Sequence, residues 1–201
     1  MVTLNHSLDP QTAIIDKPLT IAPGVELVQA IAMMSGGYDH CNFETSQNLE
    51  EWQIRARSSC ILVVEGGQLV GIFTQRDLVK ILATNSNTEQ LKVKDVMIHP
   101  VVSITTDELG DIFVPLEMLR SHGFRHLPVL DRGGKIQGLI TYESIHRLSK
   151  PINFLAIRSV AEVMDQTIVC GQGKDTLLKA AQTMSAHNSL LCWWWMITGS
   201  P

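Results

Sequence analysis

An eight-residue pattern occurs twice in this chain of 201 residues and constrains its fold more than any other feature. The first copy, residues 71–78, reads Gly-Ile-Phe-Thr-Gln-Arg-Asp-Leu, and the second, residues 138–145, reads Gly-Leu-Ile-Thr-Tyr-Glu-Ser-Ile. We call these segments the two signatures. Their glycines lie 67 positions apart, and the similar segments 94–97 and 161–164 have the same spacing. A fixed period of this length is typical of a protein built from structural repeats.

Each signature predicts a buried strand that runs directly into a helix. Two apolar residues that favour strands follow the glycine, and polar residues then precede an aliphatic one. Another aliphatic strand precedes each signature, at residues 61–64 and 127–130. The glycine-rich segments between the strands, 65–68 and 131–135, fit hairpin turns. We therefore predict a β-hairpin followed by a helix in each repeat.

Thr74 and Asp77, where strand meets helix in the first signature, allow two interpretations. Thr-x-x-Asp before an apolar run is close to a helix-capping box, which needs no ligand. The hydroxyl and the carboxylate would also present acceptors to a ligand, and a helix N-terminus favours anions. Both interpretations can hold together.

These elements together resemble the cystathionine-β-synthase (CBS) domain, from about residue 14 to about residue 189. In that family two motifs pack into a pseudo-symmetric Bateman module, whose clefts bind adenosine nucleotides or S-adenosylmethionine. The resemblance implies an α/β fold of tandem CBS motifs. Each motif is expected to be a small, mostly antiparallel β-sheet with two helices, and a pseudo-two-fold axis is expected to pair them.

The repeats also predict the domain boundaries. We expect an N-terminal arm at residues 1–13, a first CBS motif at 14–84 and a second at 92–150. An incomplete third motif is expected at 157–201, because apolar spacing resumes there but the signature does not return. Three consecutive tryptophans from Trp193 take the place of the expected strands, so we expect the chain to be a truncated piece of a longer protein.

The first motif is 16 residues longer than the second between its opening strand and its signature. We place this insertion at about residues 35–57 and expect it to cover a nearby cleft or to form a partner surface. Residues 38–41, Tyr-Asp-His-Cys, carry possible metal ligands. A structural site needs four converging ligands, so we expect no metal.

In the second motif, Asp107 is the expected N-cap of a helix that carries Leu109, Ile112 and Leu116. Pro115 falls inside this helical pattern. Since proline removes a backbone donor, we expect a kink just before it.

Composition excludes several classes of function. The net charge of −4 argues against a general nucleic-acid or anionic-membrane surface. No apolar run is long enough to span a bilayer, and the four cysteines show no Cys-x-x-Cys spacing. We therefore expect a cytoplasmic protein with reduced cysteines. No nucleophile–base pair or paired carboxylates point to an enzyme, so we expect no catalytic residue.

The resemblance implies ligand contacts in both motifs. The candidate residues are Thr20, Ile21, Thr74, Arg76, Asp77, Ile104, Arg125, His126, Thr141 and Ser144. Arg125 would bind a phosphate and His126 would stack or form a hydrogen bond, although a solvated basic loop explains both residues equally well. Ser144 replaces the expected Asp and lacks its charge, so the first motif is the better candidate.

Two functions from different classes remain open. The first is a regulatory module in which AMP, ADP, ATP or S-adenosylmethionine binds between the paired motifs and controls an attached or associated signalling effector. The second is a ligand-free module for dimerisation or interaction, because a fold alone does not determine a function. We expect a homodimer through the CBS modules in either case.

Overall fold

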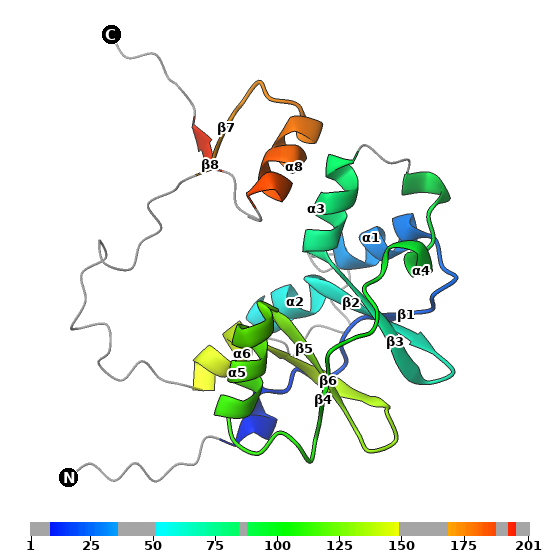
Figure 1. The fold of residues 1–201 in the computed structure, drawn as a ribbon, viewed down its shortest axis with the longest axis vertical. Helices are drawn as coiled ribbons and strands as arrows, with labels where there is room; N and C mark the ends of the chain where they lie inside the picture. The colour runs from blue at the N-terminus through cyan, green and yellow to red at the C-terminus, as the bar shows by residue number, and fades with distance from the viewer. Residues whose placement is uncertain (1–8, 36–50, 85–87, 149–168, 188–192, 196–201) are drawn as a thin grey trace, which may run out of the picture. The chain divides into compact units, whose positions relative to one another are not determined.

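The computed structural model describes residues 9–35, 51–84, 88–148, 169–187 and 193–195. The chain separates into two compact units, which are drawn in Figure 1. Unit 1 contains Met1–Phe73 and Glu89–Ile152, and unit 2 contains Thr74–Thr88 and Asn153–Pro201. We describe each unit by itself.

The first sheet of unit 1 has the strand order β1 (Thr20–Ile21), β2 (Cys60–Glu65), β3 (Gln68–Thr74). β1 runs parallel to β2, with Thr20 opposite Leu62. The central strand begins with four buried residues in succession, as expected of a strand covered on both faces.

The second sheet repeats this order with β4 (Ile104–Thr105), β5 (His126–Leu130) and β6 (Ile136–Thr141). β4 pairs with β5 in parallel, and β5 pairs with β6 in antiparallel fashion. Two equivalent three-stranded sheets confirm the tandem repeat that the signatures predict. Figure 1 shows the β2–β3 and β5–β6 hairpins with their turns toward the same side, and Gln68 Nε2 donates to Gly133 O across them at 2.9 Å.

Each sheet is joined at its edge by the segment that precedes the first strand of the other motif. Ile15, ahead of β1, pairs with Leu139 of β6 through backbone hydrogen bonds of 2.8 and 3.0 Å. Ile98, ahead of β4, pairs in the same way with Ile72 of β3 at 2.8 and 3.1 Å. The two repeats therefore complete each other's sheets.

The helices of unit 1 flank these strands. Among the described residues, one hydrophobic cluster lies around Leu127 and Val129 of β5 and another lies around Leu62 and Leu139. The helical elements outside the signature of the first motif are η1 (Pro10–Ala13), α1 (Leu27–Ser35), α2 (Glu51–Ser58), η3 (Thr88–Gln90), α4 (Val93–Val96), α5 (Phe113–His122) and α6 (Tyr142–Leu148).

Helix α2 occupies the last part of the predicted insertion, and it belongs to the core. Its Ala56 is only 6% exposed and packs in the cluster that contains Leu62 and Leu139. Residues 36–50, the larger part of that insertion, lie outside the described residues. The segment that follows them therefore supports the sheet rather than forming a separate lid.

Helix α5 begins later than predicted. Asp111 Oδ1 accepts hydrogen bonds from the backbone N–H groups of Phe113, at 2.8 Å, and Val114, at 3.3 Å. The prediction that Asp107 caps this helix is wrong, because α5 starts at Phe113. Pro115 consequently lies in the first turn, where no intrahelical donor is needed, so the reason for the predicted kink disappears.

Unit 2 contains α3 (Gln75–Ala83), β7 (Cys170–Gln172), α8 (Leu177–Ala186) and β8 (Trp193–Trp195). Helix α8 packs against α3, and Gln182 Nε2 donates to the Ala83 carbonyl at 3.4 Å. β7 and β8 pair in parallel, as do β1 with β2 and β4 with β5. The three tryptophans, expected to take the place of strands, thus themselves form a short strand, and the incomplete third motif stays a prediction.

Cys60, at the start of β2, predicts a pH dependence of stability. The side chain is 1% exposed, and burial raises the pKa of its thiol from 9.0 to about 12. Above its ordinary pKa the unfolded chain releases this proton while the folded chain keeps it. The free energy of unfolding should therefore fall with rising pH between about 9 and 12, by up to about 1.4 kcal/mol per pH unit.

Urea unfolding at about pH 8 and about pH 10 tests this dependence. The control is Cys60→Ala, which keeps every other titrating group but lacks the thiol. The difference in stability between the two pH values should be smaller for Cys60→Ala than for the original chain. Equal differences would contradict the assignment to Cys60.

Candidate functional site

The first signature forms a helix-capping box at the start of α3. Thr74 donates to Asp77 Oδ2 through its backbone N, at 3.0 Å, and through its hydroxyl, at 2.6 Å. In return, Asp77 N donates to Thr74 Oγ1 at 3.4 Å. The capping interpretation of Thr-x-x-Asp is therefore confirmed.

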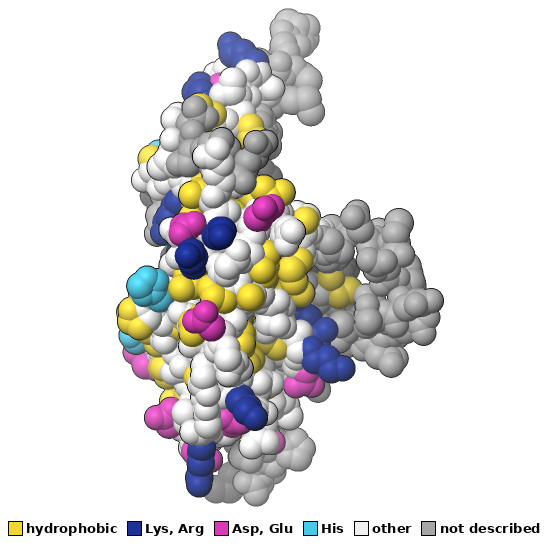
Figure 2. Space-filling model, turned by 90° about the vertical axis from the view of Figure 1, so that its right-hand side faces the viewer, with side chains coloured by type: hydrophobic (Ala, Val, Ile, Leu, Met, Phe, Trp, Pro, Cys, Tyr) yellow, Lys and Arg dark blue, Asp and Glu magenta, His cyan; other side chains and the backbone are white. Residues whose placement is uncertain are grey.

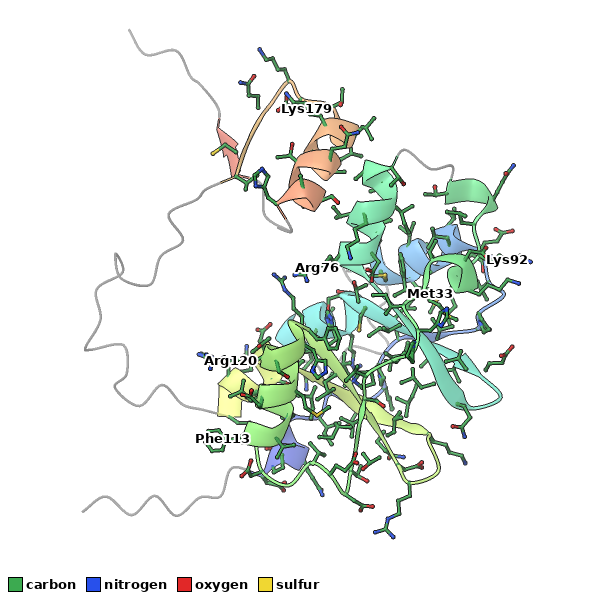
Figure 3. All side chains as sticks on the ribbon, in the orientation of Figure 1. Met33, Arg76, Lys92, Phe113, Arg120 and Lys179 are labelled. Carbon is green, nitrogen blue, oxygen red and sulfur yellow. The ribbon has the colours of Figure 1, made fainter. Side chains whose placement is uncertain are left out.

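The other carboxylate oxygen of Asp77, Oδ1, takes no part in the capping box. Oδ1 lies 3.8 Å from Lys80 Nζ, which is a loose ion pair with a largely exposed lysine. No hydrogen bond to Oδ1 is found among the described residues, although Asp77 as a whole is 7% exposed. Arg76, the preceding residue in the chain, lies in the first turn of α3 and is labelled in Figure 3. The capping box thus fixes the carboxylate and uses only one of its oxygens.

The second signature has the same local geometry without the charge. Thr141 N donates to Ser144 Oγ at 3.0 Å, and Ser144 N donates to Thr141 Oγ1 at 3.1 Å. The Ser144 hydroxyl also donates to the Thr141 carbonyl at 3.0 Å. Thr141 is 6% exposed and Ser144 is 2% exposed. A serine therefore caps α6 as the aspartate caps α3.

His126 lies opposite Thr141 in the β5–β6 register and contacts Ser59. The His126 Nε2 and Ser59 Oγ atoms are 2.6 Å apart, and the Ser59 hydroxyl donates to the Ala56 carbonyl at 2.7 Å. Because a hydroxyl has only one proton, His126 Nε2 is the donor to Ser59. Positions 59 and 126 are one repeat period of 67 apart, so equivalent positions of the two repeats meet here.

The remaining predicted residues of unit 1 have different environments. Thr20 is exposed on β1, whereas Ile21 beside it is 8% exposed. Ile104 on β4 is 2% exposed and belongs to the cluster around Leu127. Arg125 is exposed, directly before β5. Ile104 is therefore a core residue, and Arg125 is accessible to solvent.

Sequence reasoning missed Ser59. A single serine before a strand belongs to no motif, and its only signal is a position 67 residues before His126. Comparing equivalent positions of the two repeats would have singled it out.

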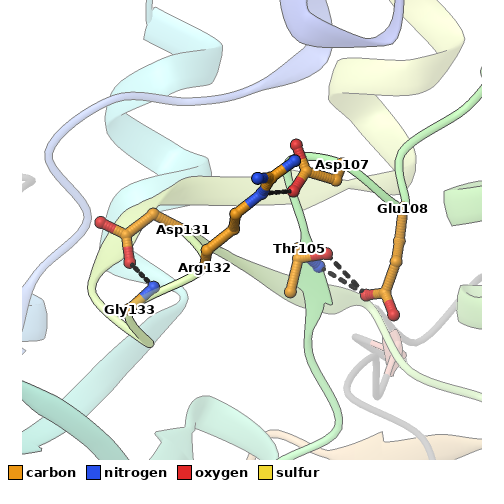
Figure 4. A network of polar contacts seen from close by, with 6 residues as sticks. All are labelled: Thr105, Asp107, Glu108, Asp131, Arg132 and Gly133. Atoms are coloured by element: carbon orange, nitrogen blue, oxygen red, sulfur yellow. Dashed lines mark hydrogen bonds and ion pairs between the residues drawn. The ribbon is translucent and has the colours of Figure 1, made fainter.

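A network of polar contacts links the segment after β4 to the β5–β6 turn (Figure 4). Thr105 donates to Glu108 Oε2 through its backbone N, at 3.0 Å, and its hydroxyl, at 2.8 Å. These bonds hold the pKa of Glu108 below its ordinary value. Arg132 in the turn pairs with Asp107, and this hydrogen bond raises the pKa of Arg132. The network is exposed and stabilises the turn beside Asp131.

No three His, Cys, Asp or Glu side chains come together as a possible metal site within the described ranges. Residues 38–41, which carry the candidate ligands, lie outside those ranges. None of the described helices has the length and apolar character required to cross a membrane.

The sequence matches the CBS domain family over residues 12–84 and 93–150, which together include both sheets and both signatures. The chain belongs to the CBS domain family. An uncharacterized protein of Methanopyrus kandleri is 33% identical over 88 residues, which cover 43% of this chain and 44% of that protein. The chain thus spans less than half of this relative. Several metabolic enzymes, including inosine-5'-monophosphate dehydrogenases, also match, over less than a third of their own length.

Two solved structures are similar to this CBS protein in fold. Protein MJ1225 of Methanocaldococcus jannaschii has a TM-score of 0.67 at 16% identity, with 90% of this chain and 63% of that chain covered. The CBS domain pair of protein MJ0100, in complex with 5'-methylthioadenosine and S-adenosyl-L-methionine, has a TM-score of 0.51 at 21% identity. The matched region includes 69% of this chain and 97% of the MJ0100 domain pair. At these identities the similarity concerns the tandem CBS fold alone.

Proposed function

We propose that this CBS protein is a regulatory ligand-sensing module that binds an adenosine-type ligand through the signature of its first motif. The observation that carries the proposal is that the Asp77 carboxylate is hydrogen-bonded within the protein through one of its two oxygens. Thr74 holds it in place through Oδ2 alone, at 2.6 and 3.0 Å. Oδ1 accepts no hydrogen bond from the described residues and has only Lys80 Nζ nearby, at 3.8 Å.

A ribose diol complements such a carboxylate. Its two hydroxyls are donors, and a hydrogen bond to a charged acceptor contributes about 1.5–3 kcal/mol. Because the capping box already orients the carboxylate, little conformational entropy is lost when the ligand binds. Arg76 in the same turn offers a guanidinium suited to a phosphate. The presence of adenosine compounds in the complex of MJ0100 supports this ligand class.

The other predicted residues belong to the same proposal in a less specific way. Thr20 and Ile21 remain proposed contacts on β1, and Ile104 remains one on β4. Arg125, His126, Thr141 and Ser144 remain proposed contacts at and next to the second signature. An attached or associated signalling effector and a homodimer are likewise proposed. We propose helices α1 and α5 of unit 1 as the surfaces through which two copies of the chain pair.

The second candidate function is a ligand-free interaction module. The capping box gives Thr74 and Asp77 a structural role without any ligand. Phe113 projects from α5 in Figure 3, and Figure 2 shows other hydrophobic side chains on the side of the molecule that lies at the right in Figure 1. The exposed large hydrophobic residues on α1 and α5 are Val28, Met33, Phe113 and Val114. They would provide a partner surface, including one for a second copy.

Asp77→Asn separates the two functions. Thermal melting with AMP, ADP, ATP and S-adenosylmethionine first identifies the ligand, because binding to the folded state raises its stability. Calorimetric titration of Asp77→Asn should then show affinity reduced by about ten- to a hundred-fold, because a charged acceptor is lost. The asparagine oxygen can still accept from Thr74 N, so the melting temperature should change little.

Asp95→Asn is the matched control. Asp95 Oδ2 accepts from Lys92 N at 2.9 Å at the start of α4, so it is also a capping carboxylate, but it is not a proposed ligand residue. This variant should bind as the original chain does. Unchanged affinity in Asp77→Asn together with lower stability would favour the ligand-free module.

A further inference from the structure

Helices α3 and α8 form one packed pair (Figure 1). Among the described helices and strands, each is the principal packing partner of the other. Ala180 and Ala181 of α8 are 8% and 4% exposed, and Gln182 Nε2 donates to the Ala83 carbonyl at 3.4 Å. This carbonyl lies in the last turn of α3, where carbonyls lack intrahelical partners. α8 therefore holds the end of α3 that lies opposite to the capping box at Asp77.

The equivalent helix of the second repeat is held differently. α6 follows the second signature as α3 follows the first, but it packs against η1 and α5 within unit 1. α3 belongs instead to unit 2, together with Asn153–Pro201. Val79 of α3 is half-buried, whereas His146, which stands 67 positions later in α6, is exposed. The helix with the charged cap is thus the one that packs against a later segment of the chain.

Neither α3 nor α8 is long enough to be stable by itself. α3 has nine residues and α8 has ten, whereas isolated helices shorter than about 12–15 residues are marginal in water. Helices of this length gain most of their stability from tertiary packing. Because Asp77 is the third residue of α3, fraying of this helix would also move its carboxylate away from the N and Oγ1 atoms of Thr74.

We infer that α8 regulates the first signature: docked on α3 it strengthens the binding of an adenosine-type ligand at Asp77, and the ligand strengthens the docking of α8 in return. This inference rests on the proposed function of Asp77. The two states are α3 folded with α8 docked, and α3 frayed with α8 released. The sign is positive because ligand binding and α8 docking both require α3 in its folded form. Linkage makes the two effects equal in free energy.

Hydrogen exchange of the full chain measures the support that α8 gives to α3. Ala181→Asp places a charge where the structure buries a methyl group, which should release α8. The amides of α3 and α8 should then exchange at least about fivefold faster, while those of α6 keep their rates. Unchanged exchange of α3 in a folded Ala181 variant would overturn the inference. If Ala181→Asp does not fold, Ala181→Ser introduces a smaller polar group at the same position and replaces it.

Leu177→Asp is the matched control for this experiment. Leu177 also belongs to α8, but its side chain is 75% exposed, and an acidic residue is favourable at the start of a helix. The same substitution should therefore leave the exchange rates of α3, α6 and α8 unchanged. Exchange of α3 that is equally fast in both variants would overturn the inference, because it would not depend on the buried face of α8.

Calorimetric titration with AMP and with S-adenosylmethionine measures the effect on the ligand. Affinity should be lower by about fivefold or more in Ala181→Asp and unchanged in Leu177→Asp. The bound compound should in turn slow the exchange of the α8 amides in the original chain. Equal affinities in the original chain and in folded Ala181→Asp would overturn the inference and leave the proposed function intact. No binding of these compounds, ADP or ATP by the original chain would overturn the proposed function and the coupling with it.

Discussion

Replacement of Gly138 by alanine is expected to lower the free energy of unfolding by about 3 kcal/mol. A Cβ atom at this position of β6 would lie 2.8 Å from the Ile15 carbonyl oxygen and would also meet the Ile14 side chain. The Ile15 carbonyl accepts a hydrogen bond from Leu139 N at 3.0 Å, so the backbone cannot move away without breaking the pairing at the sheet edge. The strain therefore remains in the folded state.

Gly71→Ala is the matched control, because Gly71 occupies the equivalent position of the first repeat. The atoms that a Cβ would meet there belong to the Met97 side chain, with Cγ at 2.9 Å. A methionine side chain is flexible and adopts another rotamer at small cost, so we expect a loss of about 1 kcal/mol. Urea unfolding of both variants measures the difference. Equal losses would show that the backbone at Ile15 yields as easily as a side chain.

Ile104→Ala should destabilise the protein by about 2–5 kcal/mol, because it removes a buried side chain and leaves a cavity. Ile104 is 2% exposed on β4 and packs in the cluster that includes Leu127 and Val129. A residue whose main role is ligand contact would lower affinity instead and leave stability nearly unchanged. The resemblance assigned Ile104 to the ligand, and that contact stays a prediction; the structure shows that its side chain also packs in the core.

Ile104→Val is the corresponding control, since it keeps the β-branched shape and should cost about 1 kcal/mol. Chemical unfolding gives both stabilities, and titration with AMP of the more stable variant gives its affinity. We expect Ile104→Val to bind as the original chain does. A marked loss of affinity with unchanged stability would restore Ile104 to the site.

The local part of this fold could be predicted from the sequence. Strand, hairpin and capped helix follow one another in each signature, and each step depends on residues close together in the chain. The capping box of Thr74 and Asp77 is of this kind, because it closes over three positions. The tandem architecture also follows, since the same local pattern occurs twice.

The non-local part could not be predicted in this way. The pairing of Ile15 with Leu139 joins segments that are far apart in the chain, and neither segment carries a pattern that specifies its partner. The contact between Ser59 and His126 is of the same kind. The start of α5 was missed for another reason, because Asp107 and Asp111 both favour a helix start and only the structure shows that Asp111 accepts from the first N–H groups of α5.

The site was partly predictable for the same physical reason. Sequence identified Asp77 and the departure at Ser144, because both are positions of a local motif. It did not reveal that Ser144 forms three hydrogen bonds with Thr141, since burial and hydrogen-bond geometry depend on the folded chain.

The exchange of edge segments between the repeats bears on how such a chain can arise. Ile15 completes the sheet of the second motif, and Ile98 completes that of the first. Two separate copies of a single-motif ancestor could make the same exchange as a swapped dimer, with each copy lending its leading segment to the other. Duplication of the gene in tandem would then turn that association into an intramolecular one, with an effective concentration on the order of millimolar for a short linker. A polypeptide cut down to one motif would present an open sheet edge, which is a template for pairing with another molecule of itself.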